Sequence, residues 1–368
     1  MPDAPDLRVA MTVEQCWQPA PGGSGTYIRE LLRAYAASGD VDVRGVAAWH
    51  RQGPSDGPLG VPVTRIPLPR QALYRGWQLL RRPEVGRRRD VVHATTWAVP
   101  GHRAPLVVTV HDLAFRHDPD HFTPHGVAFF ERGLAITRDE ATAVVVPSEA
   151  TALDCEAAGI ERARLHVVLH GVRAVAPSPA AVEAFRARHG LERPYVMWAG
   201  TREPRKNLPR LVAAFGAAVR QGADVDLVLV GPDGWGKERD RLNGTAEDRV
   251  HVLGRVTAED LAAAYAGARV FCYPSLREGF GMPVSEAMAH GTAVVTSRGT
   301  AMEEVAAGAA VLVDAEDEDD IARGLLDALD PGSHAVLTAR SRVRAAQLDW
   351  TRAARETLAV LDGAAGRR

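Results

Sequence analysis

Residues 273–288 read YPSLREGFGMPVSEAM, a stretch that places two carboxylates, Glu278 and Glu286, on either side of a glycine turn. The preceding residues 269–273 (RVFCY) are mostly apolar and β-prone, so they predict a buried strand. Pro283 suits the first turn of a helix, where its missing N–H group costs no hydrogen bond. The stretch therefore predicts a buried strand, a glycine turn and the beginning of a helix.

The glycine turn suits a phosphorylated ligand. Gly279 and Gly281 allow close approach to the backbone and leave N–H groups free at the positive end of the predicted helix. That arrangement favours a diphosphate, with Phe280 in the same donor site, while Glu278 and Glu286 can accept hydrogen bonds from sugar hydroxyls. An ordinary strand–turn–helix, with an acidic residue near the positive end of the helix dipole, is the structural alternative.

The stretch resembles the Glu-x7-Glu signature of retaining nucleotide-sugar glycosyltransferases of family 4, which have the GT-B fold. Further motifs carry this resemblance over nearly the whole chain: Gly22-Gly23, His111-Asp112, Pro147-Ser148-Glu149, His170-Gly171-Val172, Gly200 and Asn207. In that family the first glutamate contacts the transferred sugar and the second contacts the ribose of the nucleotide. The resemblance gives these roles to Glu278 and Glu286.

Composition indicates a folded protein of more than one domain. A chain of 368 residues, 46% of them hydrophobic, can bury substantial cores and is long for one domain. The net charge of −2 gives no signal for nucleic acid. Cys16, Cys155 and Cys272 match neither a disulfide framework nor a metal-ligand spacing. With no apolar run near the ~20 residues of a membrane span, we expect a soluble cytoplasmic protein.

Both halves of the chain alternate β-prone apolar runs with helical patterns, which predicts an α/β fold with parallel sheets covered on both faces. The expected strands are residues 8–13, 41–48, 91–95, 106–111, 143–147, 195–199, 227–230, 251–253, 270–273, 293–296 and 310–313. We expect two doubly wound, Rossmann-like domains that face a cleft, residues 1–172 on the acceptor side and residues 194–347 for the donor. A linker at 173–193 joins them, and the resemblance implies that a helix within 348–368 packs back on the first domain.

Arginine supplies 42 of the 44 basic residues, since only Lys206 and Lys237 are lysine. A lysine provides a compact point charge, so its retention in such a chain indicates a local need, although chance is the alternative. Lys237 lies in a charged segment that predicts a surface helix. Lys206 lies in a loop directly after a predicted strand, where function is the favoured explanation.

The leaving group of sugar transfer is a nucleoside diphosphate, whose charge grows as the glycosidic bond breaks. Fixed cations such as Lys206 act mainly in the transition state and so raise turnover. The family often has a basic residue earlier in this loop, where this chain has Gly200 or Thr201. Arg202 and Arg205 are left as candidates for the second cation, and we expect Arg205 to supply it.

The N-terminal half carries a glycine-rich turn, PGGSGT at residues 21–26, between the first predicted strand and helix. Gly22 and Gly23 can offer N–H groups to an anion, although a helix-entry turn explains them equally well. Trp17, in the loop before this turn, is a candidate for the acceptor side.

His111 and Asp112 end the predicted strand at 106–111, which points the histidine toward the carboxyl edge of the first sheet. The resemblance implies that His111 contacts the donor sugar near the reacting carbon. Asp112 then orients His111 or binds the acceptor. A histidine that is merely satisfied by Asp112 is the structural alternative.

A basic cluster, Arg81-Arg82 and Arg87-Arg88-Arg89, lies near Tyr74 and Trp77 in the sequence. Such a cluster can contact anionic lipid, which would make the protein peripheral at the inner face of a membrane. A solvated charged face is the favoured alternative.

These features together predict a retaining glycosyltransferase that moves a sugar from a nucleotide-diphosphate donor to an acceptor hydroxyl on a glycan, a lipid-linked molecule or a small molecule. The resemblance favours GDP-mannose, followed by dTDP-rhamnose and UDP-sugars, and implies that no metal or cofactor is needed. The nearest Asp-x-Asp pair, Asp224 and Asp226, precedes a strand rather than following one. A nucleotide-sugar 2-epimerase of the same fold and a catalytically silent nucleotide- or carbohydrate-binding subunit remain as alternatives.

Overall fold

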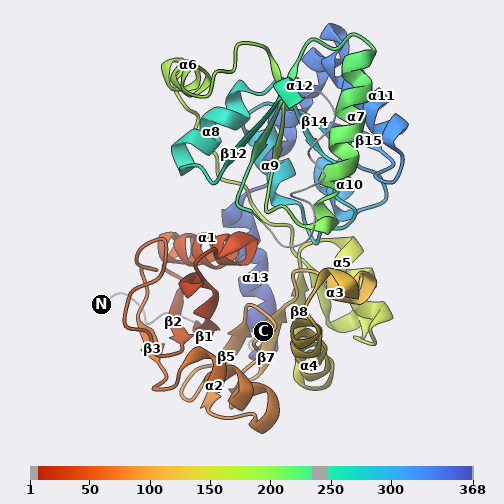
Figure 1. Ribbon diagram of the computed structural model, residues 1–368. Coiled ribbons are helices and arrows are strands. Elements are labelled where there is room, and N and C mark those ends of the chain that lie inside the picture. Colours follow the sequence, from red (N-terminus) through yellow and green to blue (C-terminus); the bar gives the residue numbers. More distant parts are fainter. Residues whose placement is uncertain (1–6, 234–246, 367–368) are drawn as a thin grey trace. The chain divides into compact units, whose positions relative to one another are not determined.

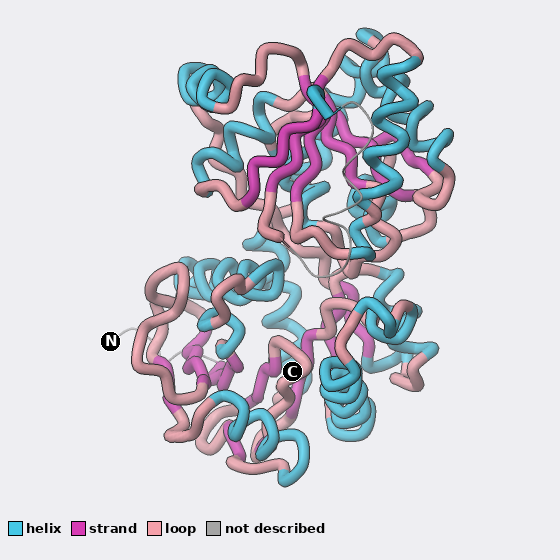
Figure 2. The backbone as a smooth tube through the Cα atoms, viewed as in Figure 1, coloured by secondary structure: helices cyan, strands magenta, loops and turns pink. Residues whose placement is uncertain are grey.

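The computed structural model describes residues 7–233 and 247–366, so Lys237 lies outside the described residues. Contacts between residues divide the chain into two compact units. Unit 1 is Met1–Gly171 with Trp350–Arg368, and unit 2 is Val172–Asp349. Each unit is an α/β layer structure around one parallel sheet (Figures 1 and 2), as the sequence predicts.

Unit 1 contains a seven-stranded parallel sheet in the order β3-β2-β1-β5-β7-β8-β9. Its strands are β1 (Leu7–Thr12), β2 (Val41–Ala47), β3 (Val63–Arg65), β5 (Val91–Ala94), β7 (Leu106–Thr109), β8 (Ala143–Val146) and β9 (Leu165–Val167). The short strands β4 (Glu84–Val85) and β6 (Gly101–His102) pair separately. Every residue of β5, β7 and β8 is buried, which explains why these strands are mostly apolar and show no alternation of apolar and polar residues.

The helices of unit 1 are α1 (Gly22–Ser38), α2 (Arg70–Arg75), α3 (Ala114–His117), α4 (Pro124–Glu140), α5 (Glu149–Ala157) and α13 (Trp350–Ala364). The C-terminal helix α13 packs against α1 and the strands β5, β7 and β8, which confirms the predicted return to the first domain. Gly171 packs directly against the start of α13, where no side chain fits, because a Cβ atom on Gly171 would lie 2.3 Å from the Trp350 backbone nitrogen. The Ser148 side chain accepts a hydrogen bond from the Thr151 N–H and caps α5.

Unit 2 contains a six-stranded parallel sheet in the order β12-β11-β10-β13-β14-β15. Its strands are β10 (Tyr195–Ala199), β11 (Asp226–Val230), β12 (Val250–Gly254), β13 (Val270–Tyr273), β14 (Ala293–Ser297) and β15 (Ala310–Val313). The strand order reverses between β10 and β13. In open α/β sheets, ligands bind at the carboxyl ends of the strands at such a switch point.

The helices of unit 2 are α6 (Pro179–Arg188), α7 (Leu208–Arg220), α8 (Ala258–Gly267), α9 (Met282–Ala289), α10 (Ala301–Ala306), α11 (Glu318–Leu329) and α12 (Pro331–Ala346). In Figure 1 the green helix α7 lies beside α11, and the two pack together. Helix α9 packs against α12.

Two details differ from the sequence expectation. Helix α1 begins at Gly22, so Gly22 and Gly23 form its first turn rather than a loop before it. The expected linker at 173–193 contains α6, which packs against α8 and belongs to unit 2. Its start has a standard helix signature that the expectation overlooked, because Ser178 caps the helix and Pro179 opens it.

No helix in the described part of the chain combines the length and apolar character that crossing a membrane requires. The three cysteines are buried and unbridged.

Candidate functional site

The loops after β10 and β13 meet at the switch point of unit 2. The Arg205 carbonyl accepts hydrogen bonds from the Leu276 N–H at 2.9 Å and the Ser275 hydroxyl at 3.0 Å. Asn207, which is buried and has a φ of 58°, donates its side-chain amide to the carbonyls of Pro274 and Ala315. These bonds fix the loop that carries Lys206 against the loop that carries Glu278.

Glu278 is held by two cations. The Lys206 ammonium donates to one carboxylate oxygen, and the Arg205 guanidinium lies 2.8 Å from the other. All three side chains are at most 13% exposed. The structure therefore brings together three residues that the sequence predicted to serve one site.

Two hydroxyls complete the surroundings of Glu278. Tyr273 donates to the Glu278 carboxylate at 2.9 Å, and the Ser275 hydroxyl lies 3.0 Å from the carboxylate and shares its single proton between Glu278 and the Arg205 carbonyl. The Lys206 Nζ atom donates to the Tyr273 hydroxyl at 2.5 Å, so Tyr273 touches both members of the ion pair. Neither Tyr273 nor Ser275 has a role predicted from the sequence.

The charge state of Glu278 follows from this geometry. Burial alone would raise the pKa of Glu278, but the charges of Arg205 and Lys206 outweigh it and lower the pKa to about 2. Burial lowers the pKa of Lys206, and Glu278 partly offsets that shift. The group is thus an ionised carboxylate between desolvated cations.

Arg202 and Arg205 have different partners. Arg202 forms an ion pair with Asp233, whereas Arg205 contacts Glu278 and also lies 3.4 Å from Glu203. Of the two arginines, Arg205 is the one that belongs to the Glu278 cluster.

Glycines allow the backbone of unit 2 to close around this cluster. Gly281 directly precedes α9 with a φ of +87°, and a Cβ atom there would lie 2.6 Å from the Met302 side chain. At the end of β11, a Cβ atom on Gly231 would lie 2.0 Å from the Gly200 carbonyl oxygen that follows β10. Gly231 was missed in the sequence, although a glycine directly after a buried strand is the available signal.

Glu286 is the fifth residue of α9, just over one turn from the start of that helix, and is partly exposed. Its Oε2 atom accepts a hydrogen bond of 2.9 Å from the Tyr265 hydroxyl of α8. Burial raises the pKa of Glu286 to about 7, and this hydrogen bond lowers it in part. The two glutamates of the signature therefore have opposite electrostatic surroundings.

In unit 1, His111 follows β7 and its Nε2 atom lies 3.0 Å from the Thr95 carbonyl. Because a carbonyl only accepts, Nε2 carries the proton and Nδ1 of the neutral ring is an acceptor. Tyr27 packs edge-on against His111 at 5.0 Å, and His170 lies 5.8 Å away. Burial lowers the pKa of His111, so the neutral form is favoured.

Asp112 closes a turn, because its Oδ1 atom accepts from the Ala114 N–H at 3.1 Å. Gly22 and Gly23 are exposed at the start of the 17-residue helix α1. Their N–H groups lie at the positive end of that helix, where an anion is favoured.

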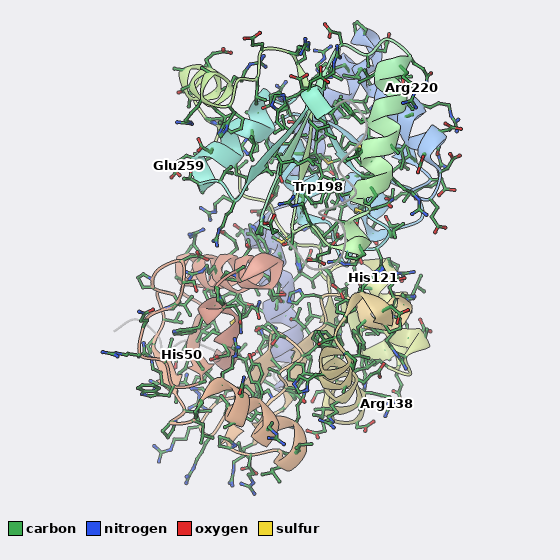
Figure 3. The ribbon with its side chains drawn as sticks, in the orientation of Figure 1. His50, His121, Arg138, Trp198, Arg220 and Glu259 are labelled. Carbon is green, nitrogen blue, oxygen red and sulfur yellow. The ribbon has the colours of Figure 1, made fainter. Side chains whose placement is uncertain are left out.

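Trp17 packs on a histidine that is bound by the buried carboxylate of Glu14, a residue not predicted for the site. The Glu14 side chain is 3% exposed and accepts from the Ala48 N–H and from His50, each at 2.8 Å. The His50 ring, labelled in Figure 3, stacks on Trp17 at 5.1 Å, and the Trp17 indole donates to the Gln52 carbonyl. Both segments follow strands β1 and β2, so they lie at the carboxyl edge of this sheet.

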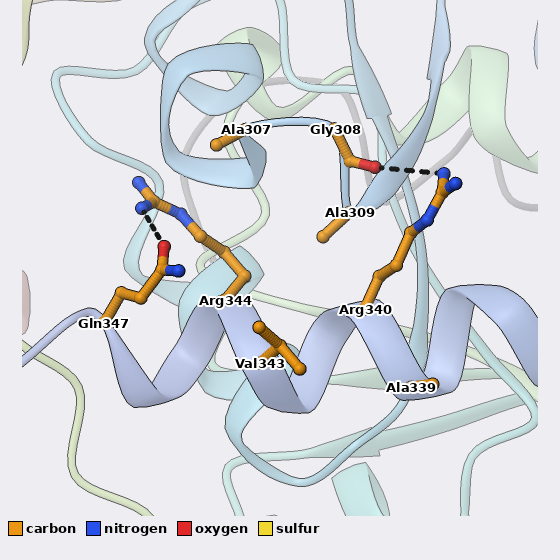
Figure 4. Close-up of a pocket in the computed structure, with 8 residues that line it drawn as sticks. All are labelled: Ala307, Gly308, Ala309, Ala339, Arg340, Val343, Arg344 and Gln347. Atoms are coloured by element: carbon orange, nitrogen blue, oxygen red, sulfur yellow. Dashed lines mark hydrogen bonds between the residues drawn. The ribbon is translucent and has the colours of Figure 1, made fainter.

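Two surface cavities of unit 2 lie apart from the signature residues. The first, 380 Å³, lies beside α12 (Figure 4) and is lined by Ala307, Gly308, Ala309, Ala339, Arg340, Val343, Arg344 and Gln347. The second, 450 Å³, lies at the opposite ends of the strands, beside Pro194 and Val225. Neither contains a residue predicted for the site, and the chemistry described above points to the carboxyl edge instead.

Two family models match this chain. The model for group 1 glycosyl transferases matches residues 193–331, and the model for the glycosyl transferase 4-like domain matches residues 22–171. The O-antigen chain mannosyltransferase B of Escherichia coli is 30% identical over 294 residues, which cover 73% of each chain. The chain belongs to the family 4-type glycosyltransferases. The predicted family and the predicted nucleotide-sugar-dependent glycosyltransferase activity are confirmed.

Another relative and a solved structure support the same family and fold. The D-inositol 3-phosphate glycosyltransferase of Salinispora tropica is 30% identical over 393 residues, 92% of this chain and 80% of that protein. The structure of Anabaena HepE in complex with UDP and glucose has a TM-score of 0.76 at 18% identity and covers 97% of this chain and 100% of that one. This similarity confirms the GT-B fold.

The raised pKa of Glu286 has a consequence for stability. The folded protein binds a proton at Glu286 more tightly than the unfolded chain does, so ionisation costs stability as pH rises from about 4.5 to 7. Glu286→Gln removes this cost, and we expect it to raise the free energy of unfolding by about 1–3 kcal/mol at pH 8 and to leave it nearly unchanged at pH 4.5.

Denaturant unfolding at the two pH values measures this difference. Glu259→Gln on the exposed face of α8 is the control and should show no such pH dependence. An equal effect of Glu286→Gln at both pH values would contradict the raised pKa.

Proposed function

We propose that this glycosyltransferase transfers a hexose with retention of configuration, without a divalent metal, and that GDP-mannose is the first donor to test. Mannose is favoured because the E. coli relative is named a mannosyltransferase, as are relatives from Mycolicibacterium hassiacum and M. smegmatis. UDP-sugars are the rival donors, because HepE was solved with UDP-glucose.

The observation that carries the proposal is the cluster of Lys206, Arg205 and Glu278 at the switch point of the donor unit. The diphosphate lies against the glycine turn and the start of α9, and Lys206 and Arg205 stabilise its growing charge as the sugar leaves. The positive charge that a metal would supply then comes from these side chains. Glu278 contacts hydroxyls of the transferred sugar, and Glu286 contacts the ribose.

His111 and the residues of unit 1 serve the sugar and the acceptor in this proposal. The neutral His111 ring offers Nδ1 as an acceptor for a hydroxyl of the donor sugar. Gly22 and Gly23 contribute N–H groups to the donor phosphates, while Trp17 and Asp112 belong to the acceptor side.

Retention is proposed to follow from front-face substitution. A double displacement needs a carboxylate nucleophile on the face opposite the leaving group. Glu278 is a poor nucleophile, because its charge is already shared by Lys206, Arg205 and two hydroxyls. The departing phosphate oxygen instead takes the proton of the acceptor hydroxyl while the two cations hold it.

We propose that only part of the predicted arginine cluster contacts an anionic membrane. Arg81 is not part of this surface, because its guanidinium binds Glu140 and the carbonyls of Trp77, Val99 and Pro100 within the protein. Arg89 pairs with Asp42 and is only 14% exposed.

The exposed members of this surface lie between residues 75 and 88. Arg82, Arg87 and Arg88 are exposed, and the turn η2 (Gly76–Leu80) presents Leu79 and Leu80, which are 55% and 72% exposed. Exposed leucines beside arginines suit the interface of an anionic bilayer.

Donor, stereochemistry and metal use can be tested with the purified protein. We expect GDP-mannose to raise the melting temperature more than dTDP-rhamnose or UDP-glucose, because ligands of the native state stabilise it. Transfer to an alkyl mannoside should give an α-linked product by NMR and should persist in excess EDTA. A β-linked product, a strict need for Mg²⁺ or Mn²⁺, or donor isomerisation without acceptor would each contradict the proposal.

Lys206→Ala should lower turnover by about 10²–10³-fold, because one preorganised charge is lost from the leaving group. Arg205→Ala should act similarly, whereas Arg202→Ala, which removes the partner of Asp233, should have the smaller effect on turnover. Steady-state kinetics with circular dichroism as a check on folding separates these outcomes. Normal turnover of Lys206→Ala would return that residue to a structural role.

Vesicle sedimentation tests the membrane proposal. Changing Arg82, Arg87 and Arg88 to serine should weaken binding to phosphatidylglycerol vesicles on the order of a hundredfold, because each basic residue near the surface contributes comparably. Phosphatidylcholine vesicles are the control. Equal binding of the wild-type protein to both vesicle types would contradict the proposal.

A further inference from the structure

Tyr265 is a fixed, buried side chain that touches one of the two signature glutamates. Its ring lies between His290, stacked at 5.7 Å, and Phe271 at 5.4 Å, and only 2% of the residue is exposed. Thr292 donates to the Tyr265 carbonyl at 2.7 Å. The hydroxyl is thereby aimed at Glu286 Oε2, to which it donates at 2.9 Å.

We propose that Tyr265 is a positioning residue that holds Glu286 in its ionised, ligand-accepting form and so sets the pH range in which the enzyme binds its nucleoside diphosphate donor. The proposal deepens the proposed function and rests on the assignment of Glu286 to the ribose of that donor.

The two glutamates show why a hydroxyl is needed at this position. Glu278 is kept ionised by Lys206 and Arg205, so its charge does not depend on a tyrosine alone. Among the described residues no cation is paired with Glu286, and its carboxylate accepts a hydrogen bond from Tyr265. A carboxylate with two acceptor oxygens suits ribose hydroxyls, and a hydrogen bond to the charged form favours that form.

The elements packed on α9 are α8, α10, α12, β13 and β14. Apart from Tyr265, the titratable and charged groups on these elements are Glu259 and Asp260 of α8, Cys272 and Tyr273 of β13, Glu303 and Glu304 of α10, and His334, Arg340, Arg342 and Arg344 of α12, with His290 directly after α9. Tyr273 is committed to Lys206 and Glu278, and Glu303 accepts from the Gly299 N–H. Burial lowers the pKa of His290, so its ring is neutral against Tyr265.

Removal of the Tyr265 hydroxyl should weaken donor binding at neutral pH. The pKa of Glu286 is about 7, raised by burial and partly lowered by Tyr265. Without the hydroxyl the pKa rises further, so a larger share of Glu286 is protonated at neutral pH. Donor binding then weakens at pH 7 and recovers as pH rises above the new pKa.

The test is the binding of GDP and UDP to the full-length protein by calorimetry between pH 6 and 9. For Tyr265→Phe we expect the midpoint of the pH dependence to move up by about one unit, which corresponds to a roughly fivefold loss of affinity at pH 7. At pH 9 the affinity should approach that of the wild type.

Tyr195→Phe is the matched control. Tyr195 is also buried, and its hydroxyl donates to α8 at the Ala264 carbonyl, the residue next to Tyr265. It therefore loses a comparable hydrogen bond to the same helix without touching a carboxylate. We expect its pH midpoint to match the wild type.

Glu286→Gln separates the inference from the function on which it rests. If nucleotide binding by Glu286→Gln keeps the wild-type pH dependence, Glu286 is not the ribose ligand and the proposed function is at fault. If Glu286→Gln abolishes the pH dependence but Tyr265→Phe leaves the midpoint in place, or weakens binding equally at every pH, the role of Tyr265 is overturned. Should Tyr265→Phe fail to fold, Tyr265→Trp serves in its place, because it also removes the phenol hydroxyl.

Discussion

The ion pair of Glu278 with Lys206 and Arg205 is the interaction on which the donor site depends. A charge buried without a partner costs several kcal/mol, and removing one member of a buried pair leaves the other uncompensated. Besides the sugar contact proposed for it, Glu278 is the counter-ion that allows two cations to remain charged and largely desolvated. A diphosphate that enters beside Lys206 and Arg205 offers them a second anion, and its attraction grows as negative charge develops on the leaving oxygen.

The backbone fold brings the two loops that carry this ion pair together. Strands β10 and β13 are neighbours in the sheet although 70 residues of chain lie between their ends, and the order reverses between them. The loop after each strand is cross-linked to the other through Asn207, Ser275 and the Arg205 carbonyl. The close approach of Gly231 to Gly200 extends the same edge to β11. These contacts hold the cations on one loop at hydrogen-bond distance from the carboxylate on the other.

The sequence predicts the strands well, because parallel strands buried on both faces must be short apolar runs. The limits expected for 195–199, 270–273 and 310–313 match β10, β13 and β15. The fold places Glu278, Lys206 and Arg205, which the sequence predicts to serve one site, within contact of one another, because the loops after β10 and β13 meet; their roles stay a prediction. Helix α6 was missed, since the proline- and alanine-rich residues before it dominated the expectation for 173–193. The start of α1 was placed too late because glycines usually indicate a loop.

The role of Tyr265 could not be predicted from the sequence, for a different reason. It lies 21 residues before Glu286 in an alanine-rich helix, where an aromatic residue is most simply explained as part of the core. Its ring is indeed core, and only the direction of its hydroxyl gives it a second role. That direction depends on the packing of α8 against α9, which no local pattern encodes.

The different surroundings of the two glutamates suit different tasks. In the proposed mechanism Glu286 contacts the ribose from the bound donor to the transition state. Such a contact contributes uniform binding, and a carboxylate that titrates near neutrality is sufficient for it. The proposed position of Glu278 beside the breaking bond requires a carboxylate that stays charged throughout, and the two cations keep Glu278 ionised. His111 in unit 1 is buried without a charge. Its ring is neutral, and its hydrogen bond to a carbonyl fixes the tautomer. Burial acts on all three groups, and the partner of each one decides whether it is charged.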